Sequence, residues 1–164
     1  MPGDTYCIDA SSLIKLKQDF PRTVFPTVWG RIEGLVSDGH LFAPIEVFNE
    51  IEKDDILGPW AKQRRTLFRP LDQEQADLAK EIVKDFPGLA KPGRFGPAAD
   101  PFVVALTHLE NRKQAAGLFD SPVRCIAVTD EGGGPQQIPA ACRAGKLTCV
   151  NLVGLFQNEG WVFR

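Results

Sequence analysis

Residues 123–131 read VRCIAVTDE, a largely apolar run that ends in a threonine and two acids. An apolar run without polar alternation is typical of a strand that is buried on both faces of a parallel sheet. Three shorter runs, at residues 5–8, 40–43 and 147–151, also favour strands. These four segments decide the fold class because a helical pattern separates each from the next.

Helical periodicity predicts helices at residues 10–17, 28–37, 45–53, 59–67, 72–85, 100–109, 138–143 and 152–157. Strands that alternate with helices indicate a mostly parallel sheet joined by right-handed crossovers. The 164 residues are the size of one domain. We therefore expect a single α/β domain over residues 1–164, a three-layer sandwich with helices flanking a central sheet.

The composition is that of a soluble globular protein, with 43% hydrophobic and 24% charged residues. No apolar run approaches the roughly 20 residues that span a membrane, and the first residues lack the features of a signal peptide. We expect a cytoplasmic protein without membrane contact. The net charge of −2 argues against a broad basic surface for nucleic acid, but it is compatible with an acidic metal site.

The cysteines form no C-x-x-C pair, and with two histidines in the chain a zinc site is not expected. We expect the cysteines to be reduced and buried, since disulfides are rare in the cytosol. The four are Cys7, Cys125, Cys142 and Cys149.

Acidic side chains follow the predicted strands, where ligands bind in open α/β sheets. Asp9 follows the first strand, and Glu46 and Glu50 lie four apart on the helix after the second. Asp130 and Glu131 follow the apolar strand, and a further acid, Asp100, opens a helix. Carboxylates that meet at one sheet edge repel each other unless cations bind between them, and oxygen ligands suit Mg²⁺ or Mn²⁺.

Each acid also has an ordinary structural interpretation. Asp100 before Pro101 is a good helix N-cap, and Glu46 and Glu50 could form a solvated helix face. Asp130 and Glu131 could be turn residues. An acid such as Asp9 that closes a buried strand is costly without a partner, so a functional role is favoured there.

Four short segments resemble the motifs of the PIN-like domain family, in the same order. They are residues 6–14 (YCIDASSLI), a strand that ends in Asp; residues 44–51 (PIEVFNEI), an apolar stretch that enters a helix, where the family motif has one Glu; residues 100–105 (DPFVVA); and residues 127–131 (AVTDE). The tail, with Ile138-Pro139 and Gly160-Trp161, looks like a PIN-like branch regarded as toxins of toxin–antitoxin pairs.

This resemblance implies a Mg²⁺- or Mn²⁺-dependent endoribonuclease that cleaves RNA, with an antitoxin protein as partner and a homodimer as a possible assembly. The implied catalytic acids are Asp9, Glu50, Asp100 and a fourth at Asp130 or Glu131. PIN domains usually place the fourth acid two residues after the Thr, at Glu131, but we expect Asp9, Glu50, Asp100 and Asp130 to bind metal. Ser11, Thr129 and Glu46 are the expected supporting residues.

Basic side chains in a helical insert, about residues 54–71, and on the Pro/Gly-rich loop are candidates for contacts with RNA phosphates. The candidates are Lys62, Arg64, Arg65 and Arg94. They could equally be ordinary solvated charges.

Two other functions remain open. A haloacid-dehalogenase-like phosphatase also begins with a strand and Asp, but it needs a second Asp where this chain has Ser11. A non-catalytic PIN-like module that binds RNA or protein would not need mutually repelling carboxylates, and failure to bind Mn²⁺ would favour it.

Overall fold

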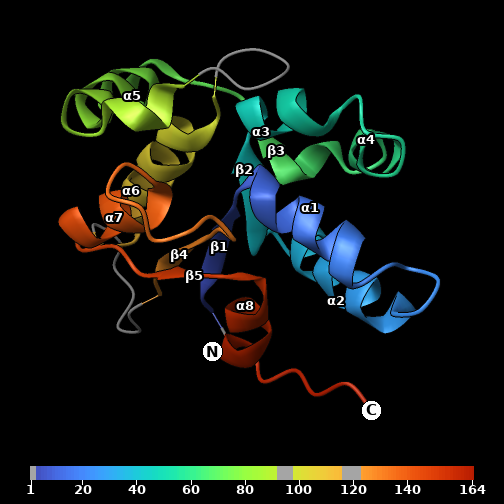
Figure 1. Ribbon diagram of the computed structural model, residues 1–164. Helices are drawn as coiled ribbons and strands as arrows, with labels where there is room; N and C mark the ends of the chain where they lie inside the picture. Colours follow the sequence, from blue (N-terminus) through green and yellow to red (C-terminus); the bar gives the residue numbers. More distant parts are fainter. Residues whose placement is uncertain (1–2, 92–97, 116–122) are drawn as a thin grey trace.

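The computed structural model describes residues 3–91, 98–115 and 123–164, and it confirms the expected α/β fold. A sheet of five parallel strands has the order β3-β2-β1-β4-β5 and is flanked by helices (Figure 1). The strands are β1 (Thr5–Ile8), β2 (Leu41–Pro44), β3 (Phe68–Arg69), β4 (Cys125–Val128) and β5 (Cys149–Val150).

Helices cover both faces of the sheet. Helix α6 packs across β1, β2 and β4 beside α5 and α7, while α1, α2 and α8 lie on the other side (Figure 1). The helices are α1 (Ala10–Asp19), α2 (Pro26–Ser37), α3 (Ile45–Ile51), α4 (Leu57–Lys62), α5 (Gln73–Asp85), α6 (Asp100–Ala115), α7 (Ile138–Ala144) and α8 (Leu152–Asn158), with 3-10 turns η1 (Arg65–Leu67) and η2 (Pro87–Ala90).

The register of the central strands brings their carboxyl ends to one edge. Ile8 lies opposite Val128 in the parallel pair of β1 and β4. The backbone N–H of Asp9 then donates to the carbonyl of Val128 at 2.8 Å, and that of Thr129 donates to Val150 at 2.9 Å. Asp9 and Thr129 therefore leave adjacent strands at the same level, as parallel pairing requires.

One strand was not expected from the sequence. The predicted helix at 59–67 is instead the shorter α4 followed by η1, and Phe68–Arg69 then pairs with Ala43 and Pro44 as edge strand β3. Two residues are too few to show a strand period, so only the pairing with β2 reveals this element. Pro44 ends β2 and directly precedes α3.

All four cysteines are free, as expected. Cys7, Cys125 and Cys142 are buried, whereas Cys149 on edge strand β5 is partly exposed, which differs from the expectation of full burial. None of the helices in the described parts of the chain has the length and apolar character needed to span a lipid bilayer.

Candidate metal centre

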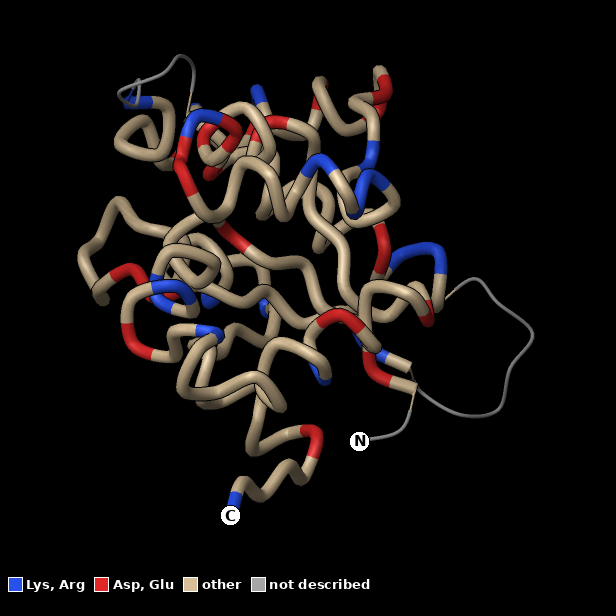
Figure 2. The backbone as a smooth tube through the Cα atoms, turned by 90° about the vertical axis from the view of Figure 1, so that its right-hand side faces the viewer, with Lys and Arg blue, Asp and Glu red and all other residues tan. Residues whose placement is uncertain are grey.

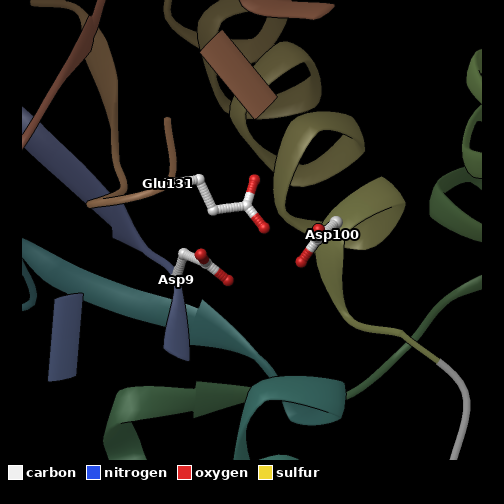
Figure 3. Close-up of side chains that lie close together, drawn as sticks. All are labelled: Asp9, Asp100 and Glu131. Carbon is white, nitrogen blue, oxygen red and sulfur yellow. The ribbon is translucent and has the colours of Figure 1, made fainter. Parts of the chain in front are cut away.

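Three carboxylates gather at the carboxyl edge of the sheet. One oxygen each from Asp9, Asp100 and Glu131 lies within 4.8 Å of the other two (Figure 3). Asp9 follows β1, Asp100 opens α6 and Glu131 lies just beyond β4. The cluster therefore depends on three segments that are far apart in the sequence and that the fold brings together.

Hydroxyl groups hold the Asp9 carboxylate. Ser11 Oγ donates to Asp9 Oδ2 at 2.7 Å, and Thr129 Oγ1 donates to the same oxygen at 3.1 Å. The Asp130 backbone N–H in turn donates to Ser11 Oγ at 3.0 Å. Ser11 and Thr129 thus occupy the positions expected of supporting residues, and both orient Asp9 through one of its oxygens.

Glu131 is held from both ends. Its backbone N–H donates to Thr129 Oγ1 at 3.1 Å, and its Oε2 accepts from the backbone N–H of Ile138, the first residue of α7, at 3.2 Å. The side chain points toward Asp9 and Asp100 (Figure 3). No local sequence pattern predicts this link to α7, because it depends on where residues 132–137 place the start of that helix.

Asp130 lies outside this group. Its Oδ2 accepts from Ser12 Oγ at 2.6 Å and from the backbone N–H of Leu152, the first residue of α8, at 3.2 Å. Metal binding by Asp130 stays a prediction, but the structure places Glu131 rather than Asp130 in the cluster, and Asp130 links α1 to α8. Ser12 and Leu152 hold Asp130 whereas Ile138 holds Glu131, so the two adjacent acids do not share one site.

Glu50 lies close to the cluster and fixes the start of α6. Its Oε1 accepts from the backbone N–H of Ala99 at 2.6 Å, one residue before Asp100. Its charge raises the pKa values of both Asp9 and Asp100. Glu46, one turn earlier on α3, is 9% exposed, and within the described chain neither of its carboxylate oxygens has a hydrogen-bonding partner.

Burial and mutual repulsion raise the pKa values of acids in the cluster, so their ionisation is disfavoured. Burial raises the pKa of Asp9 to about 6, and the charges of Glu131 and Glu50 act in the same direction. Burial raises the pKa of Asp100 to about 9, with further contributions from Asp9 and Glu131. A divalent cation would offset this repulsion, and a set of carboxylate oxygens is the ligand chemistry that Mg²⁺ and Mn²⁺ prefer.

The basic candidates for RNA contact have different surroundings. The Arg64 guanidinium lies 2.5 Å from the Glu33 carboxylate and donates to the Trp60 carbonyl at 3.2 Å, so it joins α2 to α4. This contact argues against the substrate role expected for Arg64. Lys62 and Arg65 are exposed, and Arg94 lies outside the described residues.

Fold and site together define an α/β protein with an acidic cluster at the carboxyl edge of a parallel sheet. The chain belongs to the family described as Domain of unknown function (DUF4411), which matches residues 6–163. The match includes every acid of the cluster. No curated protein matches the chain.

Proposed function

We propose that this protein is a divalent-metal-dependent endoribonuclease that hydrolyses RNA phosphodiester bonds at the acidic cluster. The observation that carries the proposal is the approach of Asp9, Asp100 and Glu131 to within 4.8 Å of one another from three separate elements. Burial and the neighbouring acids raise the pKa values of Asp9 and Asp100, which favours a site built to receive a cation.

Asp9, Asp100 and Glu131 are the proposed metal ligands, and Glu50 adds negative charge while holding the start of α6. A cation bound there would supply a Lewis acid for a phosphodiester oxygen and would activate water at neutral pH. Ser11 and Thr129 keep the Asp9 carboxylate in one orientation, which limits the reorganisation needed when a ligand arrives.

RNA is proposed as the substrate because the four acid-bearing segments resemble PIN-like motifs in order. The same resemblance supports a toxin neutralised by a partner protein. A PIN-like module that binds RNA or protein without cutting is the alternative, and it predicts that neither Mg²⁺ nor Mn²⁺ binds the cluster.

The test is cleavage of a mixed pool of structured and single-stranded RNA, with Mn²⁺ or Mg²⁺ and with chelator. Wild type, Asp9→Asn and Asp130→Asn would be compared, and Mn²⁺ binding would be measured by calorimetry on each. We expect metal-dependent cleavage by wild type and Asp130→Asn, and none by Asp9→Asn. Cleavage of equal rate in chelator, or full activity in Asp9→Asn, would refute the proposal. Absence of both cleavage and Mn²⁺ binding would favour the non-catalytic module.

A further inference from the structure

A polar cavity lies at the opposite edge of the sheet from the acidic cluster. Its volume is about 380 Å³, and its polar lining comes from α6, the start of β4 and the turn between α7 and β5. The polar lining residues are His108, Asn111, Arg112, Arg124, Lys146 and Thr148. Cys125 borders this cavity, whereas Thr129 borders the acidic cluster. Strand β4 rises about 3.3 Å per residue, so the four-residue step from Cys125 to Thr129 places the cavity and the cluster about 13 Å apart.

Positively charged side chains line the cavity. Arg112, Arg124 and Lys146 line it, and no carboxylate does among the residues that the structure describes. Arg124 is partly balanced by Asp4, with Nε 3.4 Å from Asp4 Oδ2, while Arg112 and Lys146 have no acidic partner in the described chain. Over the molecule as a whole, Lys and Arg are interspersed with Asp and Glu (Figure 2), and the net charge is −2.

His108 forms part of the wall and is held by close packing. A β-carbon on Gly145 would collide with the His108 imidazole, so the ring rests directly against the backbone at the end of α7. Burial lowers the pKa of His108, and the charge of Arg112 lowers it further. The neutral ring can donate one N–H to a bound anion, and an anion would favour its protonation.

Lys146 has an unusual backbone. Its φ is 57°, and it is the only described residue other than glycine with a positive φ. Glycine or asparagine normally occupies the left-handed position after a helix, because a β-carbon is unfavourable there. In this chain the glycine, Gly145, lies one residue earlier and packs against His108. Lys146 occupies the strained left-handed position and lines the cavity. Strain of this kind is often retained for the side chain that it positions.

Asn111 gives the cavity a rigid base. Its amide donates to the carbonyl of Cys125 at 2.9 Å and its Oδ1 accepts from the Cys125 N–H at 2.9 Å. Helix α6 and strand β4 are therefore locked together on the side where Arg112 and Arg124 project. The cavity therefore has a base fixed by Asn111, the exposed side chains of Arg112 and Lys146, which have no acidic partner in the described chain, and the exposed hydroxyl of Thr148.

We propose that this cavity binds a phosphate group, held by Arg112, Lys146 and His108. Arginine and lysine recognise phosphate through charge-assisted hydrogen bonds, and an imidazole N–H adds a third donor. The phosphate could belong to a free phosphorylated small molecule or to an RNA backbone. The cavity does not share residues with the acidic cluster, so this site stands or falls separately from the proposed nuclease activity.

Proton NMR of the two histidines gives a direct test, since His40 serves as an internal control. Pyrophosphate would be titrated into the metal-free protein, and the pKa of each imidazole followed. We expect a saturable shift of the His108 signal and a rise in its pKa, with His40 unchanged. Equal and linear drift of both histidines would overturn the proposal, because it would report ionic strength alone.

Lys146→Gly is the most informative variant because glycine relieves the positive φ, so folding should be at least as stable. It should weaken pyrophosphate binding about tenfold, and Arg112→Gln should do the same, as loss of a charged hydrogen bond predicts. Arg143→Gln on α7 is the matched control, since Arg143 is exposed but does not line the cavity. Equal affinity for pyrophosphate in all three variants would refute the site, because Arg112 and Lys146 would then interact only with the nearby helix ends.

The source of the phosphate is distinguished by a second titration, with a single-stranded oligoribonucleotide that lacks terminal phosphates, added to Asp9→Asn protein in chelator. A His108 shift with both ligands identifies the RNA backbone as an acceptable source. A shift with pyrophosphate alone identifies a free phosphorylated small molecule. A shift with neither refutes the site and leaves the nuclease proposal untouched.

Discussion

The carboxylate of Glu50 accepts a hydrogen bond from the backbone N–H of Ala99 at 2.6 Å. The Ala99 carbonyl in turn accepts the first hydrogen bonds of α6, from Phe102 at 2.9 Å and Val103 at 3.0 Å. One side chain on α3 therefore fixes where α6 begins and, with it, where Asp100 lies. Glu50 acts on the cluster in two ways, through its charge and through the backbone that carries Asp100.

These two effects can be separated by substitution. Glu50→Gln keeps an acceptor for the Ala99 amide and removes the charge, whereas Glu50→Ala removes both. We expect cleavage to fall about tenfold or more in Glu50→Gln, and the Ala variant should also lose about 1–3 kcal/mol of stability. Glu46→Gln should reduce activity less, and it should stabilise the fold because a buried carboxylate without a partner is removed. A larger loss of activity in Glu46→Gln than in Glu50→Gln would contradict this assignment of the α3 acids.

Asp9→Asn should remove activity without harming the fold. A metal ligand contributes several kcal/mol to charge stabilisation, so we expect cleavage to fall by about three orders of magnitude. Burial and two neighbouring acids raise the pKa of Asp9 to about 6, so a neutral amide should stabilise the metal-free protein above that pH. Thermal unfolding in chelator near pH 8 measures this, and a lower melting temperature than wild type would contradict it.

The adjacent acids Asp130 and Glu131 should behave differently. Glu131→Gln should abolish cleavage and weaken Mn²⁺ binding, because its carboxylate belongs to the cluster. Asp130→Asn should keep cleavage but lose about 1 kcal/mol of stability, since a charged acceptor for Ser12 and Leu152 becomes neutral. For a domain of this size that loss lowers the melting temperature by about 2–4 °C. The reverse pattern of activities would place Asp130 at the metal.

Stability without metal should fall as the pH rises. The folded-state pKa values of Asp9, about 6, and Asp100, about 9, lie above the ordinary value of 3.8. The folded chain therefore binds more protons than the unfolded chain over this interval, and the free energy of unfolding decreases between pH 4 and 9.

Melting temperatures in chelator across this interval measure the effect, with Asp100→Asn as the variant that should flatten the profile. Mg²⁺ at 100 times its Kd should add about 2.7 kcal/mol to the wild-type protein, most clearly at high pH where the acids are ionised. A wild-type profile that is flat in chelator would show that the cluster does not carry the raised pKa values.

Several features follow from the sequence because they depend on local pattern. The apolar run at 123–128 predicts a buried parallel strand, and Asp9 at the end of the first strand predicts an acid at the carboxyl edge. Parallel strands separated by helices then bring Asp9, Glu50 and the acids after β4 to the same edge. The positions of the acids after the strands were enough to predict this gathering, because parallel strands have all their carboxyl ends at the same edge of the sheet.

Other features were decided only by tertiary packing. Asp130 and Glu131 are adjacent and chemically alike, so no local pattern separates them; α8 engages one through Leu152, and α7 engages the other through Ile138. Strand β3 forms because Phe68 and Arg69 pair with β2. Arg64 contacts Glu33 because the fold brings the end of α4 close to α2. Sequence determines where the acids leave the strands. Long-range contacts between helices decide which side chain turns toward the site, because that choice depends on partners distant in the chain.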